Sequence, residues 1–203
     1  MDHKSRTKAV LGGLLSWGRP VLLAVALIAI LRVTGLMSAV TYATQWTILQ
    51  TGLRDADGEV DDAAAAFDYG FTIKDLQGNH LSFEQFKGKT IFLNLWATWC
   101  GPCRAEMPGI QSLYEKVDKE KVVFVMLSID EDSDRQKVVN YLNAKKFTFT
   151  AYMPVGYLPD QLQVPSIPTT FVISPEGKVA KKEVGTTQYD TPKFLKFLES
   201  LAE

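Results

Sequence analysis

Residues 94–108 read NLWATWCGPCRAEMP, and the two cysteines in them mark the point where one element ends and another begins. The apolar run TIFLNLWA at residues 90–97 has the length and composition of a strand buried on both faces. Beyond it, Pro102 suits the first turn of a helix, and apolar side chains recur at helical spacing as far as Val117. Cys100 and Cys103 therefore lie at a strand-to-helix junction.

This position suits thiol–disulfide exchange. A thiolate at a helix N-terminus faces unpaired backbone N–H groups and the positive end of the helix dipole, which favour the ionised form. Two intervening residues let one cysteine attack a substrate disulfide while the other resolves the mixed disulfide. We expect Cys100 to be the nucleophile, more exposed and more acidic than Cys103, with Gly101 allowing close approach of a partner chain and Pro102 stiffening the turn.

Other uses of two cysteines fit less well. A zinc site would need a further Cys or His pair, and the chain holds only two cysteines and two histidines, His3 and His80. We expect no metal and no cofactor, and we expect His80 to be a surface residue in a polar turn. A disulfide that closes so small a loop adds little stability. The formal net charge of −1 shows no excess of basic residues of the kind that binds nucleic acid.

The elements around the cysteines alternate between strand and helix patterns. Two strongly apolar strands joined by a helix imply a parallel βαβ core, and a closing hairpin implies an antiparallel edge. The expected fold class is therefore α/β, with a mixed central sheet flanked by helices. Strands are expected over residues 71–73, 90–97, 122–129, 147–153, 170–173 and 179–184, helices over 102–117, 133–146 and from 191, and a short helical turn over 82–86.

Residues 94–108, together with VPSIPTTFVI at 164–173, DLQG at 75–78 and FKGK at 86–89, resemble the thioredoxin-like proteins of the TlpA/ResA group. These are bacterial, membrane-tethered thiol–disulfide oxidoreductases on the extracytoplasmic side, and the resemblance covers roughly residues 67–202. It implies a thioredoxin-like fold. It also implies a cis peptide bond between Ile167 and Pro168, in a loop that lies beside the cysteines and offers backbone groups to an extended substrate. Trp99 is expected to face that substrate.

The resemblance also assigns a role to Glu106. Thioredoxins themselves place a buried Asp where this chain has Asn94, and an amide cannot take a proton. Glu106 follows Cys103 by three residues, one helical turn, and the TlpA/ResA pattern places it in the site, where it would accept the proton of Cys103. The alternative is a solvated glutamate that is stabilised near the helix start by the dipole alone.

The first 43 residues differ in charge from the rest. They hold five basic residues and one acidic residue, which leaves 17 basic and 22 acidic residues in the body. The apolar run at residues 21–31 would rise roughly 16 Å as a helix, short of a hydrocarbon core of about 30 Å. Extended to Tyr42 it is long enough, with Arg32 inside at a cost of about 2.5–3.5 kcal/mol. We expect a basic tail and transmembrane helix over residues 1–50, an acidic linker over 51–66 and a thioredoxin-like domain over 67–203.

Two alternatives for this segment stay open. A span that begins near Leu11 would place Arg32 at the outer edge but bury Arg19 and Pro20. A signal peptide cleaved after Ala43 fits the basic start and short apolar run. Because basic residues precede the apolar run, each alternative leaves the N-terminus in the cytoplasm and exports the body. The expected location is the inner (cytoplasmic) membrane, single-pass, with the catalytic domain on the periplasmic or extracytoplasmic side.

The expected function is that of an exported dithiol reductase acting through Cys100 and Cys103. The resemblance implies disulfide-containing envelope proteins, such as apocytochromes c, as substrates, and a membrane electron donor whose identity the sequence leaves open. The Gly-Pro pair between the cysteines, as in reducing thioredoxins, favours this direction. A net disulfide oxidase or isomerase is the alternative within enzymes, since the direction depends on reduction potential and redox partner. A redox-sensitive binding module is the alternative that is not an enzyme.

Overall fold

The computed structural model of the 203-residue chain describes residues 19–34, 36–60 and 65–202. The chain divides into two compact units, residues 1–40 and residues 41–203. The second unit carries the cysteines, the sheet and its covering helices.

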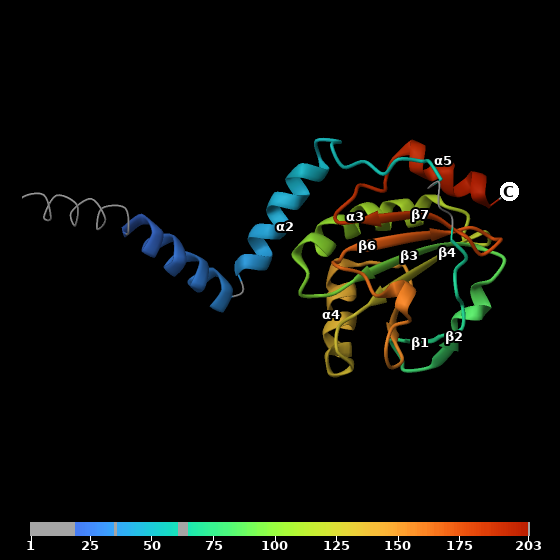
Figure 1. The fold of residues 1–203 in the computed structure, drawn as a ribbon, viewed down its shortest axis with the longest axis horizontal. Coiled ribbons are helices and arrows are strands. Elements are labelled where there is room, and N and C mark those ends of the chain that lie inside the picture. Colours follow the sequence, from blue (N-terminus) through green and yellow to red (C-terminus); the bar gives the residue numbers. More distant parts are fainter. Residues whose placement is uncertain (1–18, 35, 61–64, 203) are drawn as a thin grey trace, which may run out of the picture. The chain divides into compact units, whose positions relative to one another are not determined.

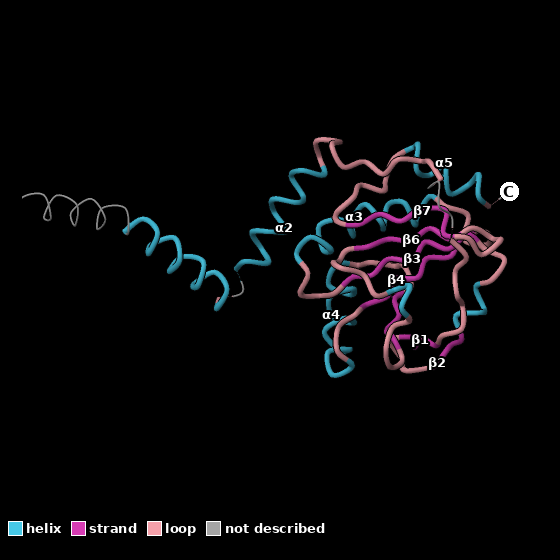
Figure 2. Tube along the Cα trace, in the orientation of Figure 1, coloured by secondary structure: helices cyan, strands magenta, loops and turns pink. Residues whose placement is uncertain are grey.

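The sheet has seven strands in the order β2-β1-β5-β4-β3-β6-β7 (Figures 1 and 2). At its centre β3 pairs in parallel with β4 and in antiparallel with β6. The parallel β4–β5 pair and three antiparallel pairs, β1 with β2, β1 with β5 and β6 with β7, complete the mixed sheet. The strands are β1 (Thr72–Asp75), β2 (His80–Ser82), β3 (Thr90–Trp96), β4 (Val122–Ser128), β5 (Ala151–Pro154), β6 (Thr169–Ile173) and β7 (Val179–Val184).

The alternation of side chains along β3 divides the core into two layers. Phe92 and Trp96 pack with residues of all three helices α3 (Gly101–Lys116), α4 (Arg135–Lys145) and α5 (Pro192–Leu201). In Figure 1, α3 and α5 lie along the same side of β3, β6 and β7. Leu93 and Leu95 pack on the opposite face, against aromatic residues of the segment 67–86. That segment includes the short 3-10 helix Phe83–Phe86, which Ser82 caps as expected. The thioredoxin-like architecture is therefore present.

Three elements differ from the sequence-based expectation. The strand expected from Phe147 begins at Ala151, because Phe147 and Phe149 stack on each other in the helical layer and pairing with β4 starts at Ala151. The helix expected from Ser133 begins at Arg135, after a 3-10 turn over Asp132–Asp134. His80 is exposed, as expected, but it pairs with Lys74 in β2 and does not lie in a turn.

The apolar N-terminal region forms two helices, Arg19–Val33 and α2 (Leu36–Leu49). The continuous helix expected through Val21 and Tyr42 is therefore not found; the first helix ends before Thr34, a weak helix former that lies in a turn. Within the described ranges, neither helix alone is long and apolar enough to cross a bilayer, and only the two taken together reach that length. The basic residues at positions 4, 6 and 8 lie outside the described residues.

Residues 54–60, within the expected linker, lie against the domain and are called the strap below. Ala56 is buried in the helical layer of the core. Further on, the N–H of Val179 donates to Ala65 O at 2.9 Å. The boundaries 50/51 and 66/67 stay predictions.

Candidate active site

Cys100 and Cys103 form a disulfide at the start of α3. Cys100 is the N-cap residue, with extended backbone, and its Sγ accepts a hydrogen bond of 3.1 Å from the N–H of Cys103. Cys100 is 6% exposed and Cys103 is fully buried. Because the helix N-terminus faces the Cys100 sulfur, a thiolate formed there is stabilised by that N–H group and by the dipole.

A buried carboxylate fixes the turn that carries the cysteines. Asp130, which follows β4, accepts hydrogen bonds from the N–H of Thr98 at 2.8 Å and from its hydroxyl at 2.6 Å. The Ser128 hydroxyl donates to the same carboxylate at 2.6 Å. Ile129 adds a backbone bond to Trp96 O at 2.8 Å. The end of β4 thus holds the end of β3, and with it the position of Cys100.

The peptide bond between Ile167 and Pro168 is cis, which confirms that expectation. The carbonyl oxygen of Ile167 lies 3.8 Å from the Cys100 sulfur. Pro168 O accepts from the N–H of Gly185, at the end of β7, at 2.8 Å. The loop before β6 is therefore held against the disulfide from the β7 side.

Two hollows flank the cysteines. An apolar groove of about 420 Å³ is lined by Trp99, Ile129 and the segment 162–167, and Trp99 at its edge is 61% exposed. A second hollow of about 300 Å³ lies where Pro102 and Pro168 meet Ile48 and Arg54. Trp99, Pro102, Ile167 and Pro168 thus all border open space next to the disulfide.

Glu106 is buried, with 2% exposure, so the alternative of a solvated glutamate is wrong. Its Oε1 accepts from Asn94 Nδ2 at 2.8 Å and its Oε2 from the N–H of Thr187 at 3.2 Å. Burial raises the pKa of Glu106 to about 8, against the lowering effects of these two hydrogen bonds and of the Arg54 charge. A carboxyl group whose pKa is close to that of a thiol is thus present one turn after Cys103.

Two hydrogen-bond donors to Glu106 and one charge that acts on it could not be predicted from the sequence. The sequence indicated only that the Asn94 amide cannot take a proton. In the structure this amide donates to Glu106 and also to Thr170 Oγ1 at 2.9 Å. A polar side chain on a buried strand just before the cysteines needs hydrogen-bond partners, and this could have indicated that Asn94 belongs to the site. Thr187 acts through its backbone and Arg54 comes from the expected linker, so neither carried a signal in its side-chain type.

The structure brings Cys100, Gly101, Pro102, Cys103 and Glu106 together on α3, with the Ile167–Pro168 loop against them. In the described part of the chain, no group of three or more His, Cys, Asp or Glu side chains is placed to hold a metal ion.

Comparison with known proteins identifies the family of the chain. The model of the Redoxin family matches residues 59–197. The chain belongs to the Redoxin family. Thiol-disulfide oxidoreductase ResA of Bacillus subtilis (strain 168) is 30% identical to this Redoxin chain over 156 residues, which cover 75% of the chain and 83% of that protein. ResA of a Bacillus cereus strain is 36% identical over 116 residues, 57% of the chain and 66% of that protein.

A solved structure agrees with the family assignment. The crystal structure of StoA from Bacillus subtilis aligns with a TM-score of 0.51 and 26% identity, over 66% of this chain and 96% of that one. With its paired cysteines in this fold, the Redoxin chain is a thiol–disulfide oxidoreductase of the ResA family.

Proposed function

We propose that this oxidoreductase is an exported, membrane-anchored dithiol reductase of envelope proteins, such as apocytochromes c. The observation that carries the proposal is the Cys100–Cys103 pair at the start of α3, facing the carbonyl of Ile167. A nucleophilic sulfur beside the backbone carbonyl of Ile167 suits an extended segment that contains a disulfide.

The reaction begins with the reduced pair. The Cys100 thiolate attacks one sulfur of the substrate disulfide, a Cys100–substrate bond forms, and the other substrate sulfur leaves as a thiolate that takes a proton from water. Cys103 then gives its proton to the Glu106 carboxylate and attacks the Cys100 sulfur. The Cys100–Cys103 disulfide forms and the second substrate thiolate leaves, so two electrons pass to the substrate.

Glu106 suits the proton step because its pKa, raised to about 8 by burial, lies near that of a thiol. A carboxylate with an ordinary pKa would be a much weaker base for Cys103. The buried position also keeps water from competing for the proton.

Substrate contacts fall on the residues around the disulfide. The backbone of Ile167, before the cis Pro168, is available to pair with an extended chain, and Gly101 leaves room for it next to Pro102. Trp99 and the apolar groove beside it accept an apolar side chain near the reacting cysteine.

The anchor comprises the apolar residues between Arg19 and Leu49, and the basic residues before them favour a cytoplasmic N-terminus. An alkaline phosphatase fusion after Glu203 is expected to be active, and carbonate washing is expected to leave the protein in the membrane. Activity of a cytoplasmic reporter would overturn the topology, and release by carbonate would favour a cleaved signal peptide.

The substrate and the direction are tested together. Cys103→Ser in cells is expected to accumulate mixed disulfides with envelope proteins, which mass spectrometry then identifies. For a reductase, deletion of the protein leaves the trapped partners oxidised. Partners that instead become reduced after deletion would make the protein a net oxidase, and an absence of turnover in insulin reduction with dithiothreitol would favour a binding module.

A further inference from the structure

The strap lies next to the loop that holds Glu106. Arg54 Nε donates to Thr186 O at 3.0 Å, and the N–H of Gln188 donates to Arg54 O at 2.7 Å. The N–H of Ala56 donates to Gln188 O at 2.9 Å. Three hydrogen bonds thus join the strap to residues 186–188, and the N–H of Thr187, between them, donates to Glu106.

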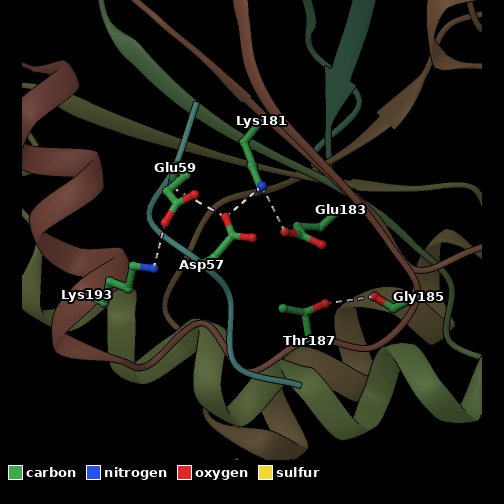
Figure 3. A network of polar contacts seen from close by, with 7 residues as sticks. All are labelled: Asp57, Glu59, Lys181, Glu183, Gly185, Thr187 and Lys193. Atoms are coloured by element: carbon green, nitrogen blue, oxygen red, sulfur yellow. Dashed lines mark hydrogen bonds and ion pairs between the residues drawn. The ribbon is translucent and has the colours of Figure 1, made fainter. Parts of the chain in front are cut away.

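The strap is also fixed on its far side. Lys181, whose side chain is 9% exposed, contacts Asp57 at 2.6 Å and Glu183 at 3.6 Å, and Lys193 contacts Glu59 at 3.3 Å (Figure 3). At Gly58 a β-carbon would lie 2.9 Å from Lys193 O, so the strap backbone lies directly on the start of α5. These contacts hold the strap at a fixed depth.

The position of the strap brings the Arg54 guanidinium to the side of the domain that carries the cysteines. Gly185, with φ +91°, turns the chain out of β7, and a β-carbon there would lie 3.0 Å from Arg54 Nη2. Arg54 also borders the hollow that Pro102 and Pro168 line. The guanidinium therefore reaches the cysteine side of the domain from a segment that the sequence presents as a linker.

We infer that Arg54 is a positioning residue for the proton step: it holds the 186–188 loop against Glu106 and supplies the positive charge that keeps a share of Glu106 ionised. The inference rests on the role of Glu106 proposed above. It makes the segment after the membrane anchor a part of the redox site, so loss of the Arg54 charge would leave a larger share of Glu106 neutral and slow the resolution by Cys103.

The groups that face Glu106 from the surrounding elements agree with this role. They are the neutral amide of Asn94 on β3, the N–H of Thr187 and the phenol of Tyr189, whose pKa is raised by burial and also by the Glu106 charge. Arg54 is the cation that acts on the Glu106 carboxyl, and its attraction opposes the effect of burial on the Glu106 pKa.

The test uses the oxidised full-length protein in detergent micelles. Infrared spectroscopy follows the carboxylic C=O band of Glu106 with pH, identified by its loss in Glu106→Gln. In Arg54→Gln the midpoint is expected to rise by about half a pH unit or more, and Arg54→Lys is expected to recover at least half of that shift because it restores the charge. Asp57→Asn cuts the strap contact to Lys181 but keeps Arg54, and its midpoint is expected to stay within about 0.2 unit of wild type.

An unchanged midpoint in Arg54→Gln would overturn the inference, and so would an equal shift in Asp57→Asn, since strap attachment alone would then explain it. The infrared titration does not depend on turnover. The rate of mixed-disulfide resolution is measured separately: if Glu106→Gln leaves that rate and its pH dependence unchanged, the proposed role of Glu106 fails, whatever the titration of Arg54→Gln shows.

Discussion

The two halves of the redox site are built differently. The Cys100 end comes mainly from neighbours in sequence: the N-cap position, the N–H of Cys103 and the proline at the helix start. The Glu106 end comes from neighbours in space, since its hydrogen-bond donors lie on β3 and on the loop after β7, and the positive charge that lowers its pKa belongs to Arg54 on the strap. The nucleophile therefore depends on local geometry, whereas the acid–base group depends on how distant segments pack.

Exchange of the cysteines tests the local half and has the largest expected effect. Cys100→Ser is expected to abolish insulin reduction and mixed-disulfide formation, because the sulfur at the helix N-cap is lost. Cys103→Ser is expected to keep the first attack and accumulate the adduct, which non-reducing gels detect. Alkylation of reduced protein at neutral pH that modifies Cys103 before Cys100 would reverse the two roles.

Exchange of Glu106 tests the half built from distant segments. The pKa of Glu106 rises from 4.5 to about 8 on folding, so the unfolded chain ionises first as the pH increases. The ionisation of Glu106 therefore leaves the free energy of unfolding unchanged below pH 4.5. Between pH 4.5 and about pH 8 it lowers that free energy by about 1.4 kcal/mol per pH unit.

Glu106→Gln removes this pH dependence, although it loses the bond from Thr187. Relative to wild type, the variant is therefore expected to gain stability steadily between pH 5 and 8, measured by urea unfolding of the oxidised protein. A constant difference between Glu106→Gln and wild type over this range would contradict the raised pKa.

Asp130 combines local and distant contacts, because it follows β4 and its carboxylate holds the turn that carries the cysteines after β3. Asp130→Ala leaves the N–H of Thr98 and the hydroxyl of Ser128 without their acceptor. We expect a loss of about 1–3 kcal/mol in the free energy of unfolding, measured in urea. Ser128→Ala, which removes one of the donors, is expected to lose less. Equal losses in the two variants would mean that the carboxylate does not hold the turn.

The smallest effect is expected at the exposed edge of the strap. The side chains of Lys193 and Glu59 are 58% and 77% exposed, and such pairs contribute little. Lys193→Gln keeps the carbons that contact Gly58 and is expected to stay within about 0.5 kcal/mol of wild type in urea unfolding. A larger loss would mean that the ion pair, and not the backbone contacts, holds the strap.

The sequence was sufficient where the physical cause is local. Apolar runs predicted β3 and β4, a turn signal between apolar segments predicted β6 and β7, and helical spacing of apolar residues predicted α5. Pro102 with the cysteines placed the start of α3, because burial and helix capping act over a few residues. The family resemblance supplied the cis bond before Pro168, which no local pattern distinguishes from the trans bond.

Tertiary structure decided the rest. The start of β5 depends on where β4 offers a partner, and the acidic residues at 55–60 resemble a solvated linker until Lys181 and α5 are placed beside them. The state of Glu106 was decided in the same way. A glutamate in the first turns of a helix is ordinarily solvated, but here Glu106 is buried and interacts with Asn94, Thr187 and Tyr189. Desolvation depends on all the atoms that surround a group, and those atoms come from segments far apart in the chain.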